Sequence, residues 1–404
     1  MTHDRVPLGI LDLVPVVSGS DAGRALCNAM DLVQVAEQLG YRRYWFAEHH
    51  LNSGVAGSAP ALLIAMAGAT TERIRLGSGG VQSGHRTPLS VVEEFGLLDA
   101  MHPGRVDLGI GRSGGRTFFK DKLERSNGQG TGRERAVRRD RYTDNGLLIP
   151  AAPSLRHLAG APRITLTAQM LQQEGATSAE YGDLVEDILG LLDGTYRSHD
   201  GLDPHPVPGA GARVEPWILG SSPGESAAVA GRLGLRFAAS YHISPATALS
   251  AAHAYREAFV PSTDLERPYL AVSADVVVGP DDETARHAAS GYAEWVRSIR
   301  CGEGAIPFPD PVEASSRHWT PEDEALVHDR VASQIVGSPE TVVQGLARLQ
   351  EATKADELIV TTITHSHQDR VRSYALLARA WSDQSDDSSA VGEQASLTMS
   401  QPTG

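Results

Sequence analysis

Short apolar runs alternate with helical patterns over residues 6–111, and this alternation restricts the fold more than any other feature of the chain. The apolar runs lie at 6–13, 43–47, 74–77 and 105–111, and the helical patterns between them at 21–39, 59–70 and 88–101. Strands that alternate with helices at this spacing form right-handed βαβ units and a parallel sheet. Four strands in roughly 110 residues correspond to half of a (β/α)8 barrel.

The alternation stops after Arg112 and resumes near residue 217. Further apolar runs lie at 217–220, 236–240, 270–278 and 357–362. They bring the number of predicted strands to eight, so we predict a single (β/α)8 TIM barrel of the α/β class over residues 1–381. Residues 112–212 form a long insertion after the fourth strand, with one predicted helix at 180–192, in the position of a lid. Residues 382–404 contain few apolar side chains and are predicted to be a disordered tail.

The composition argues against several kinds of partner. The formal net charge of −14 repels phosphate backbones, so no nucleic-acid partner is expected. No window approaches the ~20 apolar residues that a membrane-spanning helix needs, and the N-terminus lacks the pattern of a secretory signal. The two cysteines, Cys27 and Cys301, have neither disulfide-framework nor zinc spacing, which predicts a reducing, cytoplasmic location. Cys27 falls within a helical pattern and is predicted to be buried.

Polar residues and glycines gather where the predicted strands end. These positions are Glu48-His49-His50, Ser78-Gly79-Gly80, Arg112, Ser221-Ser222 and Ser240-Tyr241-His242. In a parallel barrel such residues share one mouth, and imidazoles beside a carboxylate can transfer protons near neutral pH. Adjacent residues of an extended chain point to opposite sides, so His49 and His50 are not expected to bind one ion, and no metal site is predicted. The alternative is that one of these histidines packs against a helix.

Gly220-Ser221-Ser222 precedes a predicted helix that contains Ser226. Backbone N–H groups at a helix start, together with hydroxyls, form a seat for phosphate, and Arg112 can add bidentate recognition. Ordinary N-capping is the alternative. Gly79 and Gly80 would let a flat ligand approach the backbone, although a simple turn explains them equally well.

These segments together resemble the bacterial luciferase-like monooxygenase family. The similar stretches are WFAEHH at 45–50, RIRLGSGGV at 73–81, the segment from Pro88 to Arg112, LGSS at 219–222, and the stretch from GSPETV to ADELIVTT within 337–362. Residues 82–86, the insertion and the tail depart from the family pattern. The substrate therefore cannot be carried over from relatives.

The resemblance implies a barrel that binds FMN, or in some branches the deazaflavin F420, at the strand ends. The flavin phosphate would be held by Ser221, Ser222, Ser226 and Arg112, with Ser240 nearby. Ser78, Gly79 and Gly80 would lie behind the flavin ring, with a cis peptide bond between the two glycines. His49 matches the family's active-site histidine, and Glu48 and His50 are further catalytic candidates.

The function implied by the resemblance is that of a two-component monooxygenase. A separate reductase would supply reduced FMN, and O2 would be used to oxygenate a small organic substrate, for which we expect a polyketide-like secondary metabolite. Relatives suggest a homodimer. Three alternatives stay open: an F420-dependent hydride-transfer enzyme, a non-catalytic flavin-binding protein, and a metal-dependent hydrolase, for which the strand ends offer too few ligands.

Overall fold

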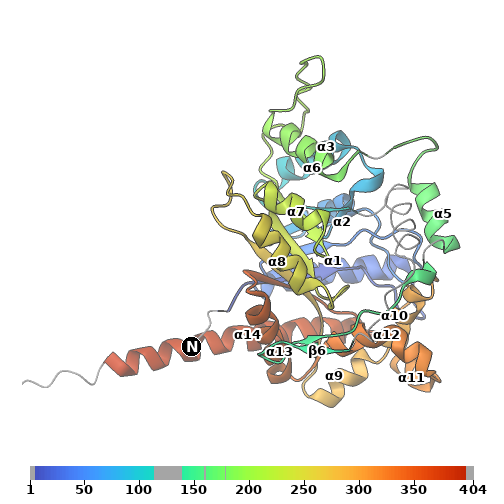
Figure 1. Cartoon of the computed structure of the whole chain (residues 1–404). Helices are drawn as coiled ribbons and strands as arrows, with labels where there is room; N and C mark the ends of the chain where they lie inside the picture. The colour runs from blue at the N-terminus through green and yellow to red at the C-terminus, as the bar shows by residue number, and fades with distance from the viewer. Residues whose placement is uncertain (1–4, 113–138, 159–160, 178, 397–404) are drawn as a thin grey trace, which may run out of the picture.

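Eight parallel strands close into a ring in the computed structural model, which describes residues 5–112, 139–158, 161–177 and 179–396. In ring order they are β1 (Leu8–Asp12), β2 (Arg43–Phe46), β3 (Arg75–Ser78), β5 (Val106–Gly111), β8 (Glu215–Gly220), β9 (Arg236–Ser240), β10 (Leu270–Val278) and β12 (Glu357–Thr361). β1 closes the ring because it pairs with β2 on one side and with β12 on the other. The predicted (β/α)8 barrel is thereby confirmed (Figure 1).

A helix follows each barrel strand on the outside of the ring. These helices are α1 (Ala22–Gln38), α2 (Pro60–Gly68), α3 (Pro88–Met101), α6 (Tyr181–Asp193), α7 (Glu225–Arg232), α8 (Ala248–Ala258), α13 (Pro339–Thr353) and α14 (His367–Ser396). The local sequence explains where several of them begin: the side chains of Asp21, Thr87 and Ser338 accept hydrogen bonds from backbone N–H groups in the first turns of α1, α3 and α13.

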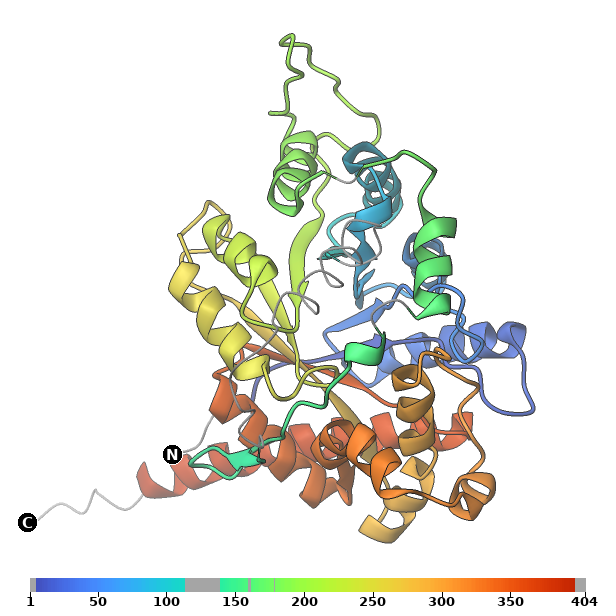
Figure 2. The ribbon, with the colours of Figure 1, turned by 45° about the vertical axis from the view of Figure 1, so that its right-hand side comes forward.

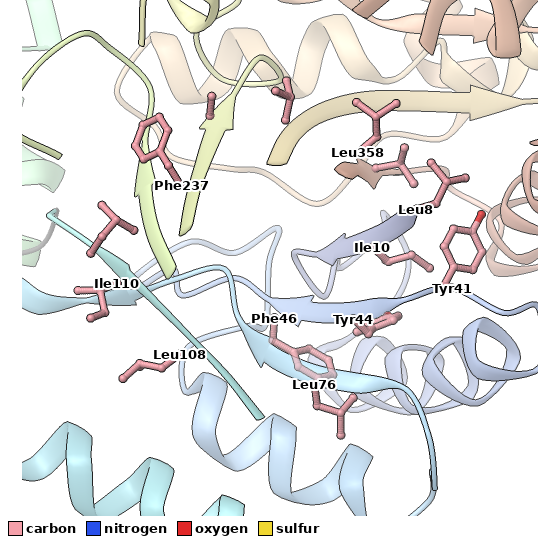
Figure 3. Close-up of a cluster of buried hydrophobic side chains, with 14 of the residues drawn as sticks. Leu8, Ile10, Tyr41, Tyr44, Phe46, Leu76, Leu108, Ile110, Phe237 and Leu358 are labelled. Atoms are coloured by element: carbon pink, nitrogen blue, oxygen red, sulfur yellow. The ribbon is translucent and has the colours of Figure 1, made fainter. Parts of the chain in front are cut away.

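The strands bury apolar side chains on both faces. Tyr44 and Phe46 face the helices, in a cluster with Ile10 and Leu76 (Figure 3). Trp45 lies between them in sequence and packs inside the barrel, against Trp217. This alternation follows from the two-residue period of a strand. It explains why the strands read as continuous apolar runs rather than as alternating ones.

The longer connections carry additional elements. They are β4 (Val81–Gln82) and η1 (Ser83–His85) after β3; β6 (Arg141–Tyr142), β7 (Leu148–Ile149), η2 (Arg156–Leu158) and α5 (Pro162–Leu171) in the insertion; and α9 (Asp282–Ala289), α10 (Tyr292–Arg300), α11 (Pro311–Ser316), α12 (Pro321–Ser333) and β11 (Ile335–Gly337) between β10 and β12. The sequence analysis predicts α6, as the helix at 180–192, but not α5, α11 or α12. Weak periodicity in these polar segments leaves little signal for a helix.

The described part of the insertion reaches the opposite side of the barrel from β5. The Tyr241 hydroxyl, which follows β9, donates to the Leu148 carbonyl over 2.7 Å. The Asn145 amide donates to the Arg348 carbonyl of α13 over 2.9 Å. Figure 2 shows this green segment running past the helices of the C-terminal half. Its role as a lid stays a prediction.

Two details differ from the sequence analysis. The prediction of a buried Cys27 is wrong, since its side chain is exposed and Ala25, Ala29 and Leu32 form the buried face of α1. α14 continues past Trp381 to Ser396, within the segment predicted to be a disordered tail, and extends away from the barrel (Figure 1). Residues 397–404 lie outside the described residues. None of the described helices is long and apolar enough to span a membrane.

Candidate active site

A cavity of about 520 Å³ opens at the carboxyl ends of the barrel strands. Its size is within the ~300–1,000 Å³ usual for small-molecule sites. Its lining includes most of the residues singled out in the sequence, namely Glu48, His49, Gly79, Gly80, Arg112, Ser221, Ser222, Ser226 and Ser240. The strand ends therefore converge on one site, as parallel barrel geometry requires.

One end of the cavity lies at the start of α7, where the backbone and side chains favour an anion. Gly224 precedes the helix, and Ser222 and Ser226 line the cavity beside it. Arg112 reaches the same place from the end of β5, where its Nη1 donates to Glu225 Oε2 over 2.6 Å. A helix start, two hydroxyls and an arginine together offer donors to a phosphate group. Glu225 balances the arginine charge and holds the guanidinium in position.

The middle of the cavity is formed by two glycines at the end of β3. The peptide bond between Gly79 and Gly80 is cis. A Cβ atom on Gly79 would lie 2.4 Å from Leu11 Cδ1, and one on Gly80 would lie 2.7 Å from the Gly109 carbonyl oxygen. Larger residues do not fit without movement of the barrel interior, so a bare stretch of backbone lines the cavity at this point.

Two neutral histidines, His49 and His242, also line the cavity. Burial, followed by the nearby His50, lowers the pKa of His49 to about 4. Burial, followed by the charge of Arg330, lowers the pKa of His242 to about 3. Both rings are therefore uncharged at neutral pH. His242 Nδ1 lies 2.6 Å from Ser273 Oγ, whereas His49 Nδ1 is buried without a hydrogen-bond partner among the described residues. A buried imidazole nitrogen with no partner is unusual in a purely structural position.

Glu48 lies behind His49 as a fixed anion. Its Oε1 is 2.9 Å from His50 Nε2 and 3.2 Å from His85 Nε2, and its Oε2 accepts the Gln82 N–H over 3.0 Å. Burial favours the neutral acid, but the hydrogen bonds from His50, His85 and Gln82 outweigh it and lower the pKa of Glu48 to about 2. The cluster fixes the loop after β2 to the segment after β3.

With this geometry established, comparison with known proteins identifies the family. The sequence model of the luciferase-like monooxygenases matches residues 6–140 and 160–355. The chain belongs to this family. It is 34% identical over 375 residues to the uncharacterized protein YvbT of Bacillus subtilis (strain 168), covering 93% of this chain and 96% of that protein. It is 31% identical over 380 residues to a luciferase-like monooxygenase of Escherichia coli (strain K12), covering 93% and 97%, respectively.

Solved structures with this fold include two kinds of cofactor. The structure of apo-MsnO8 is similar with a TM-score of 0.72 and 29% identity, over 93% of this chain and 98% of that one. More distant structures share the fold alone: an FMN complex of a type II Baeyer–Villiger monooxygenase from Pseudomonas putida, at 19% identity, and an F420-dependent secondary alcohol dehydrogenase, at 14%, each with a TM-score of 0.57. A luciferase-like barrel therefore admits either FMN or F420.

Two of the sequence-predicted site residues are not among the residues that line the cavity. Ser78 is fully buried, and its hydroxyl donates to the Gly109 carbonyl and accepts the Gly109 N–H, each over 2.9 Å. It joins β3 to β5 instead of facing the mouth. His50 lies outside the cavity lining, on the Glu48 side of the strand end. The prediction that adjacent histidines point apart agrees with this placement.

The sequence analysis did not assign a role to His85, although its nitrogen, that of His50 and a Glu48 oxygen lie within 4.8 Å of one another. Three such ligands could hold a metal ion. However, both imidazoles already share Glu48 Oε1, and His85 Nδ1 is buried with no partner in the part of the chain that the structure describes. A metal-bound histidine normally donates its second nitrogen to an acceptor. The geometry is therefore that of a hydrogen-bonded cluster, and the absence of a metal stays a prediction.

Proposed function

We propose that the protein is a monooxygenase that uses reduced FMN, delivered by a separate reductase, and O2 to oxygenate a small organic substrate. The observation that carries this proposal is that one cavity combines an anion seat at α7, a bare glycine backbone after β3 and, after β2, the neutral His49, whose Nδ1 has no partner among the described residues. Around the ring of strands the seat after β8, the glycines after β3 and His49 after β2 follow one another in the order of the phosphate, the flat ring and the reactive edge of a flavin.

The types of residue that line the cavity suit the chemical groups of FMN. Ser221, Ser222, Ser226 and Arg112 would bind the phosphate, Ser240 would lie beside it, and the Gly79–Gly80 backbone would support the ring. Reduced FMN, when bound, supplies the electrons for reaction with O2. The apolar walls at Leu11, Trp45 and Ile359 exclude water from that reaction.

His49 is the residue that we assign to proton transfer. Its pKa of about 4 leaves the ring neutral, so it can accept a proton on one nitrogen and donate from the other at neutral pH. The Glu48–His50–His85 cluster holds the strand end that carries it. We therefore assign Glu48 and His50, which the sequence analysis treats as catalytic candidates, a positioning role.

A binding and reoxidation experiment tests this proposal. Purified protein is titrated anaerobically with photoreduced FMN, mixed with aerated buffer in a stopped-flow cell, and followed through the absorbance of oxidised flavin. We expect binding, and reoxidation slower than that of free FMN, with the delay shortened in His49→Asn. Reoxidation at the free rate would contradict the oxygenase and support a non-catalytic flavin-binding protein.

A parallel titration with F420 separates the nearest alternative. Tight binding of F420 and none of reduced FMN would identify a hydride-transfer enzyme on the same fold. We expect the reverse, followed by O2 consumption that depends on an added flavin reductase and NAD(P)H. The substrate would then be sought among small organic molecules, with polyketide-like secondary metabolites as the first panel.

We also propose that two copies of the chain associate through α2 and α3. These helices pack side by side and expose several large apolar side chains, including Leu62 at 68%, Leu97 at 57% and Met101 at 74% exposure. An exposed apolar surface of this kind is typical of an interface between subunits. Light scattering after size exclusion should give a dimer mass for the wild type and a monomer mass for Leu97→Lys/Met101→Lys. A monomeric wild type would contradict the proposal.

A further inference from the structure

A buried arginine lines the cavity and has a role in none of the steps above. Arg330 belongs to α12, a helix in the long connection between β10 and β12. We propose that Arg330 binds an acceptor oxygen, of a carbonyl or a carboxylate, on the organic substrate. The proposal rests on the proposed function, because it assigns the part of the cavity that the flavin leaves free.

The hydrogen bonds of Arg330 leave one nitrogen available. Its Nε and Nη2 donate to the Tyr292 hydroxyl oxygen over 3.0 and 2.8 Å, and Nη2 lies 3.3 Å from Asp275 Oδ2. Nη1 has no hydrogen-bond partner among the described residues and is not enclosed by protein atoms. The side chain is only 10% exposed and lines the cavity, so we infer that this nitrogen faces the cavity.

The surrounding contacts fix the guanidinium rigidly. Tyr292 donates to Asp275 Oδ2 and accepts from two nitrogens of Arg330, so the three side chains form a closed buried network. Asp275 lies within β10, two residues beyond the Ser273 that contacts His242 and therefore on the same face of the strand. A planar donor held in this way loses little conformational entropy when it binds a ligand oxygen.

Arg330 lies near the histidines, away from the anion seat at α7. Arg330 and His49 both interact electrostatically with His242, which places the three side chains close together in the cavity. The anion seat has its own arginine, Arg112, which contacts Glu225. Arg330 therefore faces the space beside His49, where the substrate must lie to react.

The chemistry of this end defines the ligand class. Trp295 and Ile299 line the cavity next to Arg330 and offer apolar contact. Asp275 balances the arginine charge, so the site does not demand a charged ligand and admits a ketone as well as a carboxylate. A charged donor forms a stronger hydrogen bond with either oxygen than a neutral donor would. The class is thus a compact apolar molecule with one exposed carbonyl or carboxylate oxygen.

Binding of three similar probes tests the assignment. Acetophenone and benzoate carry the acceptor oxygen, and cumene has nearly the same shape without it. Dissociation constants are measured by titration calorimetry on the full chain, with and without FMN. We expect acetophenone and benzoate to bind at least about tenfold more tightly than cumene, as for a hydrogen bond to a charged group.

The variants are Arg330→Met and the charge-balanced pair Arg330→Met/Asp275→Asn, which removes the carboxylate that the first change leaves buried and unpaired. In both, the preference over cumene should disappear while the dissociation constant of FMN stays the same. The double variant keeps the test valid if Arg330→Met alone does not fold.

Three results would overturn the proposal: no preference in the wild type, a preference that persists in the double variant, or a change of tenfold or more in FMN affinity, which would assign Arg330 to the flavin instead. Failure of the proposed function gives a different result. In that case FMN does not bind the wild type, while the probe preference and its loss in the variants can still be present.

Discussion

The amino and carboxyl ends of the barrel strands differ in how some of their buried polar groups are paired. At the amino ends of the strands, Arg43 Nε donates to Glu357 Oε1 over 2.7 Å, and its Nη1 contacts Asp107 and, over 3.2 Å, Glu215. At the carboxyl ends, His49 and His242 are buried without charge, and single nitrogens of His49 and Arg330 lack a partner among the described residues.

This difference in pairing distinguishes groups that stabilise the fold from groups that are available for binding or catalysis. A buried charge among satisfied acceptors holds strands together and offers little to a ligand, whereas an unsatisfied donor or acceptor that faces a cavity is available to one. In this barrel the Arg43 network joins four strands at their amino ends, whereas His49 Nδ1 and Arg330 Nη1, which have no partner among the described residues, belong to side chains that line the cavity.

The largest effect is expected at the paired end. Arg43→Met leaves Glu357 buried without its cation and Asp107 with Arg75 alone, which should lower the free energy of unfolding by about 3–5 kcal/mol. Urea unfolding followed by circular dichroism measures it. Arg236→Met is the matched control, since its Nε lies 3.5 Å from Glu215 at a partly exposed position, and should cost less than ~1 kcal/mol. An equal decrease in the free energy of unfolding in both variants would mean that the buried Arg43 network stabilises the fold no more than the partly exposed contact of Arg236.

For His49 we expect a large effect on turnover and a small effect on stability. His49→Asn should reduce the turnover number by roughly 10²–10⁴, the usual contribution of a positioned proton-transfer group, with little change in the urea midpoint. His50→Asn is the control: it lies outside the cavity lining and should affect turnover less. A larger loss in His50→Asn would transfer the catalytic assignment to the Glu48 cluster.

Ser226, in the first turn of α7, and Ser78, at the end of β3, provide a second comparison. Ser226→Ala should weaken FMN binding about 10- to 100-fold, because it removes a donor to a charged phosphate. Ser78→Ala should leave the FMN dissociation constant unchanged and lower stability by about 1–3 kcal/mol, since the Gly109 N–H and carbonyl lose their partner. Fluorescence titration and urea unfolding distinguish the two. Loss of FMN affinity in Ser78→Ala would contradict the placement of its hydroxyl.

The smallest effect concerns pH. His242 has a pKa of about 3 in the fold and 6.5 as a reference, so the unfolded chain binds the proton first as pH falls. Its contribution to stability is complete above pH 6.5 and is lost progressively toward pH 3, by about 1 kcal/mol between pH 6.5 and 5.5. His242→Asn should flatten this part of the stability curve relative to the wild type. Identical slopes would mean that the ring is solvated in the fold.

Glu48 should affect stability at a lower pH than His242. Its pKa is about 2 in the fold against a reference of 4.5, so its contribution is present above pH 4.5 and is lost as pH falls toward 2. The stability difference between wild type and Glu48→Gln should therefore be constant from pH 5 to 8. A difference that varies in that range would contradict the lowered pKa of Glu48.

The eight strands and most of the cavity could be predicted from the sequence for one physical reason. In a barrel built from βαβ units, the carboxyl ends of all strands open on one mouth. The residues that directly follow the predicted strands, such as Arg112 and Ser221, are therefore the ones expected to line the cavity. Ser78 was an exception because the face that a strand residue occupies depends on a one-residue register. The burial of Cys27 was mispredicted because the helical pattern alone left the orientation of α1 uncertain by one residue.

The sequence by itself determined the barrel, the family and the residues that each strand contributes to its own end. Only the tertiary structure brought His85 to Glu48 and placed Arg330, with Tyr292 and Asp275, beside the histidines at the cavity. These residues come from connections whose lengths and helices follow no period, so their position depends on packing against distant strands rather than on local pattern. Whether a nitrogen is left without a partner is likewise decided by all its neighbours at once, and no single segment of the chain records it.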